Sequence, residues 1–267
     1  MTTFPVADSA TMLRRNLKHQ LRYPSLTLML AGFPIVFLLL FVYVFGGQLG
    51  SGLGGTVAPS GDRGAYLTYV VPGILIVTVA SAALGTAISV ASDMTGGIID
   101  RFRTMSIGRG AVLTGHVVGS LLQTLAVLAL VVVVAVAIGF RSGAGALEWL
   151  ATAAILLLFA FALIWLSAAL GLAARSVETA SNTPMFLTLL PFLSSGFVPT
   201  DSMPAGLRQF AEYQPFTPVT QTVRGLLSGG PVGTDAVAAV AWSVAITVAS
   251  YLWALHLYDT RRAADPQ

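Results

Sequence analysis

The sequence predicts an all-α integral membrane protein, in which an N-terminal interfacial helix precedes six transmembrane helices. Of the 267 residues, 55% are hydrophobic and only 9% are charged, whereas about a quarter of the residues of a soluble domain are charged. The mean hydropathy is +0.82. The apolar residues are also gathered into long runs with few charges, and a run of about 20 such residues crosses the hydrocarbon core of a membrane.

The composition excludes several kinds of chemistry. The chain contains no Cys, which excludes disulfides, thiolate catalysis and cysteine metal sites. The ATP-binding motif G-x-x-x-x-G-K-[ST] is absent, as are the metalloprotease and serine-hydrolase motifs H-E-x-x-H and G-x-S-x-G. We therefore expect no enzymatic activity, no cofactor and no metal in this chain. The net charge of +3 follows from membrane topology, so we expect no binding of nucleic acid.

The first predicted helix covers residues 9–23. Leu13, Leu17 and Leu21 recur every four residues and form a narrow apolar stripe, and basic residues occupy the remaining surface. Ser9 is a suitable N-cap, and Pro24 marks the end of the helix. This pattern is typical of a helix that lies in the plane of the inner lipid headgroups.

Six apolar segments follow, and we expect each of them to cross the membrane. They comprise residues 26–45, 66–92, 112–138, 149–174, 179–197 and 236–258. Pro34 should kink the first span without ending it, because neighbouring helices can cover the freed carbonyl group. Pro184 and Pro191 interrupt the fifth span.

Between the last two spans, residues 198–231 are too polar to cross the membrane and too apolar for a simple loop. We expect one or two short amphipathic helices here: Met203, Leu207 and Phe210 can form the face of one, and residues 220–227 can form another. They would dip into the outer membrane surface, which a bilayer tolerates only where protein covers the backbone.

Basic residues orient the six spans. Ten of them lie on the side of the two termini and of residues 93–109, and four lie on the other side. Because Lys and Arg accumulate on the cytoplasmic side of membrane proteins, we expect a multi-pass protein of the cell membrane with both termini in the cytoplasm. Residues 1–267 would form a single membrane domain.

Two patterns within the spans are candidates for contact with a substrate. Phe33, Phe37 and Phe41 form a stripe that either packs against lipid and helices or forms an aromatic wall. Hydroxyl side chains of the second span either pack against helices or contact a ligand. No acidic or basic residue lies in the middle of a predicted span. A charge there costs about 2.5–3.5 kcal/mol on insertion scales, so its absence argues against coupling to protons or sodium ions.

Residues 93–109, between the second and third spans, are the strongest candidate for contact with a partner. Read as a short helix, this stretch places on one face the apolar residues Ile98, Ile99, Phe102 and Met105. The other side carries the charged residues Asp100, Arg101 and Arg103. Such a helix lies at the lipid surface or inserts its apolar face into a groove of a partner. A solvated loop that merely marks the inner face is the third interpretation, and we favour the partner.

Two segments resemble the signature regions of ABC-2 type permeases, in particular those of the daunorubicin-resistance branch. They are GGIIDRFRTMSIGR at 96–109 and the stretch 192–227, which contains the runs FVPTDSMP and QPFTP. With the layout of one helix followed by six spans, the resemblance covers nearly the whole chain. Ser106 departs from the family pattern, which often has Pro there, so the end of the cytoplasmic helix is expected to differ in angle.

The resemblance implies a permease subunit of an ATP-driven exporter for a drug, a polyketide or a lipid. It would pair with a second permease copy or a sibling permease within the lipid bilayer, and with two copies of a separate ATP-binding subunit that holds ATP and Mg. Residues 93–109 would be the coupling helix and residues 9–23 the connecting helix. The coupling helix would insert Ile99, Phe102 and Met105 into the ATP-binding subunit as docking anchors. Around these anchors it would contact the same subunit through Asp100, Arg101 and Arg103. The second and fifth spans would line the path, and the outer gate would include Phe197, Pro199, Pro204 and Pro215.

Two alternatives remain open at the level of the sequence. One is a membrane scaffold or sensor whose ATPase partner drives something other than transport, and the hydroxyl side chains of spans two and five favour transport over it. The other is an ion-driven carrier, which uptake driven by protons or sodium without any ATPase would support.

Overall fold

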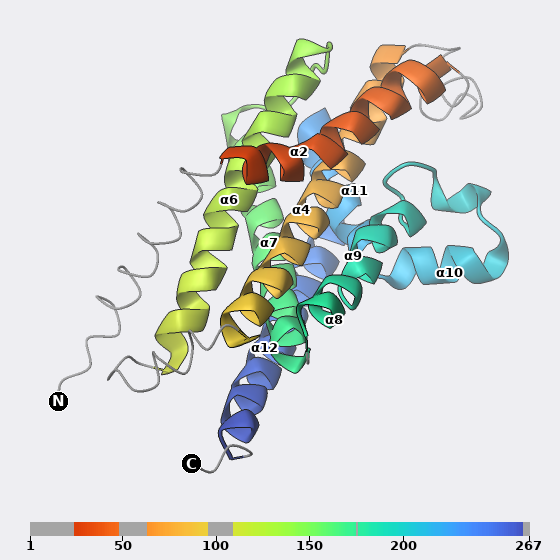
Figure 1. The fold of residues 1–267 in the computed structure, drawn as a ribbon. Coiled ribbons are helices and arrows are strands. Elements are labelled where there is room, and N and C mark those ends of the chain that lie inside the picture. Colours follow the sequence, from red (N-terminus) through yellow and green to blue (C-terminus); the bar gives the residue numbers. More distant parts are fainter. Residues whose placement is uncertain (1–23, 48–62, 96–108, 175, 264–267) are drawn as a thin grey trace.

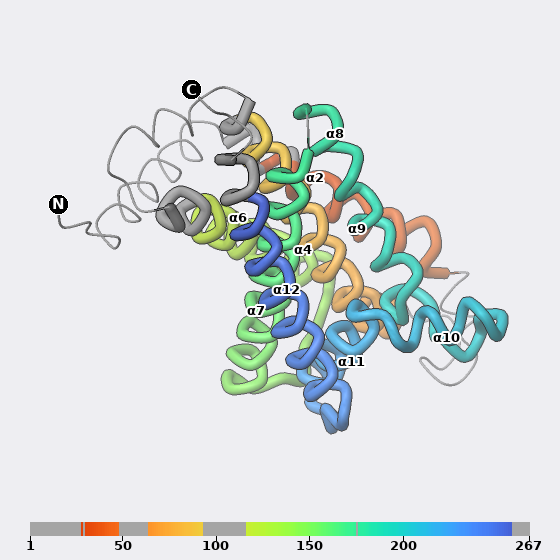
Figure 2. Tube along the Cα trace, turned by 90° about the horizontal axis from the view of Figure 1, so that it is seen from below, coloured from red at the N-terminus to blue at the C-terminus, as the bar shows by residue number. Residues whose placement is uncertain are grey.

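The computed structural model describes residues 24–47, 63–95, 109–174 and 176–263. Within these residues every regular element is a helix and no strand occurs. Long helices lie side by side along one bundle, and a shorter helix, α10 (Ala205–Tyr213), projects from its side (Figures 1 and 2).

The first apolar segment forms α2 (Pro24–Leu39), which continues directly into a π-helix, η1 (Leu40–Phe45). Pro34 lies inside α2 and does not end it, as its sequence context predicted. Turns of π-helix are rare and occur frequently at functional sites.

The second segment forms α4 (Arg63–Thr95), the central helix of the bundle. It contacts α2, α6, α7, α8, α9 and α11, and nearly every side chain from Tyr66 to Ala80 is buried. A helix that is apolar on all sides buries all of its faces, which explains this central place. Gly171 of α7 brings the two backbones close together, because a Cβ atom added there would lie 2.6 Å from the carbonyl oxygen of Ala87.

The third, fourth and sixth segments form α6 (Arg109–Ala137), α7 (Ala146–Ala173) and α12 (Asp235–Ala263). Helix α7 packs on α4, and α12 packs on α7 and α11; the rings of Trp165 and Tyr251 meet edge to face at 5.0 Å. Helix α12 leaves many large apolar side chains uncovered: Val237, Val240, Trp242, Val244, Val248, Tyr251, Leu252, Trp253 and Leu255. Such a surface suits contact with lipid.

The fifth segment is not one helix. It consists of α8 (Val177–Asn182), α9 (Met185–Leu189) and a 3-10 turn, η2 (Leu190–Leu193). Pro184 and Pro191 explain the breaks, because proline lacks a backbone N–H and clashes with the preceding turn. The prolines in the sequence indicated an interruption, but the division into three short pieces is a finding of the structure.

The polar segment after it forms η3 (Thr200–Ser202), α10 and α11 (Phe216–Ser228). Helix α11 is deeply embedded and contacts α4, α7 and α12, and the Phe159 and Phe216 rings meet edge to face at 5.1 Å. Gly229 ends α11 in the left-handed conformation, with φ of 69°, which glycine adopts without steric cost. One or two short helices were predicted here; the structure has two short α-helices and a 3-10 turn, and α11 begins at Phe216, before the predicted start at residue 220.

Four helices within the described residues are long and apolar enough to cross a membrane, and they correspond to the second, third, fourth and sixth predicted spans: Gly64–Ser92, His116–Ala137, Ala146–Ala173 and Asp235–Leu257. The first predicted span contains a shorter apolar helix, Leu30–Phe45, and the fifth is broken. The structure thus supports an all-helical membrane protein with several spans, whereas the count of six stays a prediction.

Candidate functional site at the hairpin end of the bundle

Helices α4 and α12 both begin at the end of the bundle that is uppermost in Figure 1. We call this end the hairpin end. At the opposite end, α4 finishes at Thr95 and α6 begins at Arg109, so these helices flank the predicted coupling stretch. The proposed docking and rim residues of that stretch lie outside the described residues: Ile99, Asp100, Arg101, Phe102, Arg103 and Met105. So does the stripe of the predicted connecting helix: Leu13, Leu17 and Leu21. Their roles stay predictions.

Phe197, a predicted gate residue, lies in an aromatic cluster that joins the first apolar segment (α2 and η1) to the end of the fifth segment. Its ring stacks on Phe41 at 4.6 Å and on Phe192 at 5.0 Å, and the side chain is only 4% exposed. Phe37 extends the cluster, because its ring lies 5.2 Å from Phe192. The Phe stripe therefore packs against the fifth segment at Phe37 and Phe41, whereas Phe33 stays 45% exposed.

The three predicted gate prolines stand at the beginnings of the short helices. Pro199 precedes η3, Pro204 precedes α10 and Pro215 precedes α11. The Pro204 carbonyl accepts a hydrogen bond from the Arg208 N–H at 2.8 Å. Because a fixed φ near −65° suits proline to helix beginnings, these residues set where each short helix starts.

Arg224 of α11 is the central side chain of the hairpin end. Its Nη2 donates to the carbonyl oxygens of Ser195 at 2.8 Å, Tyr69 at 3.2 Å and Gly196 at 3.4 Å. Its Nη1 donates to Oε1 of Gln221 at 2.9 Å, and its Cζ lies 4.0 Å from the centre of the Tyr69 ring. We call these five residues the Arg224 cluster. The planar guanidinium suits such a set, since it donates several hydrogen bonds and stacks on an aromatic face.

Further hydrogen bonds hold the turn at 194–196 in place. The Tyr69 hydroxyl donates to the Ser195 carbonyl at 3.1 Å, and the Ser195 N–H donates to Oγ1 of Thr217 at 3.2 Å. Nε2 of Gln214 donates to the carbonyl of Leu193 at 2.6 Å. Helices α4 and α11 thus both hold the end of the fifth segment through its backbone.

The turn also touches α4 backbone to backbone. A Cβ atom added to Gly73 would lie 2.7 Å from the Gly196 carbonyl oxygen and 2.9 Å from the Gly196 Cα. Such distances leave no room for a side chain at position 73. The two glycines therefore allow the approach that brings the Tyr69, Ser195 and Gly196 carbonyls within reach of one arginine.

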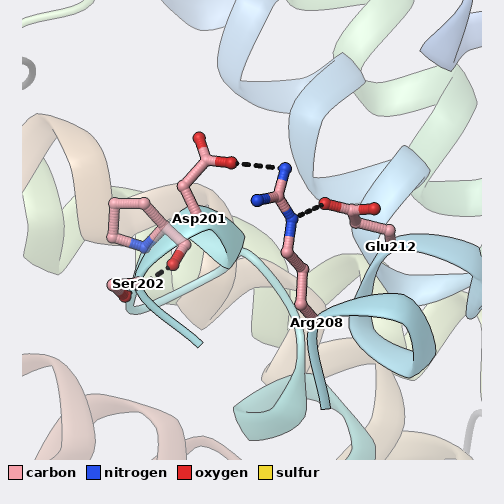
Figure 3. Close-up of polar contacts among 5 residues, drawn as sticks. Asp201, Ser202, Arg208 and Glu212 are labelled. Carbon is pink, nitrogen blue, oxygen red and sulfur yellow. Dashed lines mark hydrogen bonds and ion pairs between the residues drawn. The ribbon is translucent and has the colours of Figure 1, made fainter. Parts of the chain in front are cut away.

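A second arginine, Arg208 of α10, has a contrasting environment. It donates from Nε to Glu212 at 2.7 Å and pairs with Asp201 at 2.7 Å on the exposed surface (Figure 3). The hydrogen bond that Arg208 donates to Glu212 and the negative charge of Asp201 raise the pKa of Arg208. The hydrogen bonds that Arg224 makes to the described residues, by contrast, go to neutral oxygens. Its positive charge is therefore balanced by dipoles and by an aromatic face.

Sequence reasoning missed the Arg224 cluster. The sequence places Arg224 within the predicted helix over 220–227 and among the four basic residues of the outer side, but it assigns no partner to this side chain, which stands between Val223 and Leu227 on a helix with a buried apolar face. The feature of the sequence that could have identified Arg224 was its position inside a short amphipathic helix, next to the apolar face of that helix. Its partners are backbone atoms, which no residue pattern identifies. Within the described ranges, no three His, Cys, Asp or Glu side chains gather as metal ligands.

Comparison with known proteins identifies the family. Residues 9–227 match the model of the family described as "ABC-2 type transporter". The chain is 29% identical over 225 residues to the daunorubicin resistance ABC transporter permease protein DrrB1 of Streptomyces coeruleorubidus, covering 84% of this chain and 76% of that relative. It is 23% identical over 187 residues to the probable doxorubicin resistance ABC transporter permease protein DrrC of Mycobacterium tuberculosis, covering 70% and 67%. The matched family model extends over most of the chain, which belongs to the ABC-2 type transporter family.

Proposed function

We propose that the chain is the membrane permease of an ATP-driven exporter that moves a hydrophobic or amphipathic substrate out of the cell. The observation that carries this proposal is the family match over residues 9–227. The names of two relatives point to anthracycline drugs, daunorubicin and doxorubicin, which combine an apolar ring system with a charged amine. Compounds of that chemical kind are our first candidate substrates.

The distribution of charge supports an external source of energy. In the described long helices, acidic and basic residues lie only near the ends: Arg63, Asp93, Arg109, Glu148, Asp235, Asp259, Arg261 and Arg262. Ion-coupled carriers commonly keep an ionisable group within the membrane. We propose that a separate ATP-binding subunit, in two copies, supplies the free energy.

One stripe of α4 supports a path beside that helix. Towards its end, α4 leaves the residues at positions 81, 84, 85, 88 and 89 partly or largely uncovered, and these positions recur at helical spacing on one face. Ser81 and Ser89 put two hydroxyl groups on this stripe. We propose that the stripe, together with the fifth segment, faces a substrate path between two permease copies.

At the other end, we propose that Phe197 and the short helices that begin after Pro199, Pro204 and Pro215 form the outer gate. The aromatic cluster supports this role, because the buried Phe197 ring and the partly buried rings of Phe37, Phe41 and Phe192 fill the contact between α2, η1 and the end of the fifth segment. The π-helix η1 contributes Phe41 to this cluster and also carries Phe45; the two rings lie 5.7 Å apart.

The test of the partner uses the predicted coupling helix. Phe102→Asp should abolish co-purification of the chain with its ATP-binding subunit, because a carboxylate cannot enter an apolar groove without a large desolvation penalty. Thr104→Asp is the matched control: it adds the same charge about 200° around the same helix and should leave co-purification intact. Equal recovery of the ATP-binding subunit with both variants would remove this helix from the docking role.

A further inference from the structure

We propose that Arg224 is a releasable latch at the hairpin end: it holds α11 against α4 and the turn at 194–196 in the closed state, and it lets go when the substrate leaves. This inference rests on the proposed export function. In this role Arg224 is a positioning residue that controls whether the hairpin end of the path is closed.

One side chain connects three parts of the chain. Arg224 reaches the Tyr69 carbonyl of α4, the Ser195 and Gly196 carbonyls of the turn, and Gln221 one turn earlier on its own helix. The Tyr69 ring packs on the flat face of the guanidinium. Withdrawal of this single group would therefore break its own hydrogen bonds to both neighbours at once, and the hydrogen bond from the Ser195 N–H to Thr217 would remain between α11 and the turn.

The hydrogen bonds of the latch suit reversible opening. Its acceptors are neutral oxygens, and its Nε atom is buried with no hydrogen-bond partner among the described residues. A buried charge without an opposite charge is costly, and water would satisfy every guanidinium N–H in an open state. The closed state thus gains several hydrogen bonds and loses hydration, and these opposing contributions reduce the difference in free energy between the two states.

The surfaces that separate would do so without interlocked side chains. The turn meets α4 through the backbones of Gly73 and Gly196 and through the hydrogen bond from the Tyr69 hydroxyl to the Ser195 carbonyl, which breaks when they part. Helix α11, by contrast, is fixed to α7 by the rings of Phe159 and Phe216. We therefore expect α11 to stay with α7, on which α4 also packs, while the turn moves away from Arg224.

The test exploits the absence of Cys from the chain. Ser195 is fully buried and its Oγ has no hydrogen-bond partner among the described residues, so Ser195→Cys introduces a single thiol with little perturbation. The full-length chain in liposomes is treated with a membrane-impermeant sulfonated maleimide. Arg224→Gln should accelerate labelling of this thiol at least about tenfold, a change of about 1.4 kcal/mol in the opening equilibrium.

Two controls separate the latch from a loss of structure. Arg208→Gln removes an exposed arginine of the neighbouring helix and should leave labelling of Ser195→Cys unchanged. Ser167→Cys places a second reporter in α7, where the Ser167 side chain is also buried and its Oγ also lacks a partner within the described ranges; it should stay unreactive when Arg224 is replaced. A smaller acceleration at Ser195→Cys, or an equal one in either control, would overturn the proposal.

A second variant and a second state complete the test. If Arg224→Gln fails to fold, Arg224→Lys keeps the charge but lacks the planar fork; it should still accelerate labelling about threefold or more, and unchanged labelling would overturn the proposal.

With Arg224 in place, Mg-ATP should accelerate labelling of Ser195→Cys in the complex with the ATP-binding subunit. No acceleration would overturn the release step. The first measurement needs neither ATP nor a partner, so failure of the latch is distinguishable from failure of the export function.

Discussion

The backbone contact between Gly73 and Gly196 leads to a quantitative prediction. In Gly73→Ala, the added Cβ would lie 2.7 Å from the Gly196 carbonyl oxygen. Restoring an ordinary contact of 3.4 Å requires the two backbones to separate by about 0.7 Å, because both colliding groups are backbone and neither can rotate away. The hydrogen bond from Arg224 to Gly196, already 3.4 Å long, would then be lost.

Gly85→Ala is the matched control on the same helix, since nothing lies within 4 Å of a Cβ atom added there. Both substitutions gain about 1 kcal/mol of helix propensity, which cancels in the comparison. Overpacking typically costs about 1–3 kcal/mol. We therefore expect Gly73→Ala to be less stable than Gly85→Ala by about 1–3 kcal/mol.

Unfolding by sodium dodecyl sulfate in mixed micelles, followed by circular dichroism of the helices, measures this difference. The Gly73→Ala variant should unfold at the lower detergent fraction. If the two variants unfold together, the close approach of α4 to the turn does not exist in the protein, and the geometry inferred for the Arg224 cluster fails with it.

Two further predictions concern the same end of the molecule. Phe197→Ala should lower the free energy of unfolding by about 3–5 kcal/mol in the same titration, because a ring that is 4% exposed leaves a cavity. Phe186→Ala, which removes a ring that is 48% exposed, should change it little, and equal losses would contradict the aromatic cluster. Ser142→Ala removes the hydrogen bond from Ser142 Oγ to the Leu227 carbonyl at 2.8 Å and should cost about 0.5–1.5 kcal/mol. Hydrogen exchange of the Gly143 amide, which donates to the same carbonyl, should accelerate, and an unchanged rate would contradict that contact.

The long helices could be predicted from the sequence because continuous apolar runs are a local signal. The second predicted span, 66–92, lies within α4 (Arg63–Thr95), and the fourth, 149–174, overlaps almost all of α7 (Ala146–Ala173). Proline also acts locally, so the breaks at Pro184 and Pro191 were visible in advance. The short helices after Pro204 and Pro215 followed from their spacing of apolar residues.

The site at the hairpin end could be predicted only in part, because its contacts join residues far apart in the chain. Phe197 stood out through a motif, but its stacking on Phe41 depends on how the first and fifth segments meet. The acceptors of Arg224 are carbonyl oxygens, and every residue carries one. The π-helical turn at Leu40–Phe45 likewise has no signature in the residue pattern that we recognised.

The most direct test of the proposed function is transport of daunorubicin into inside-out vesicles that contain the full-length chain, with and without its ATP-binding subunit. Accumulation should require both the subunit and Mg-ATP, and imposed proton or sodium gradients should not replace them. Accumulation driven by such a gradient in vesicles that contain the chain alone would contradict the proposal that this permease takes its energy from a separate ATPase.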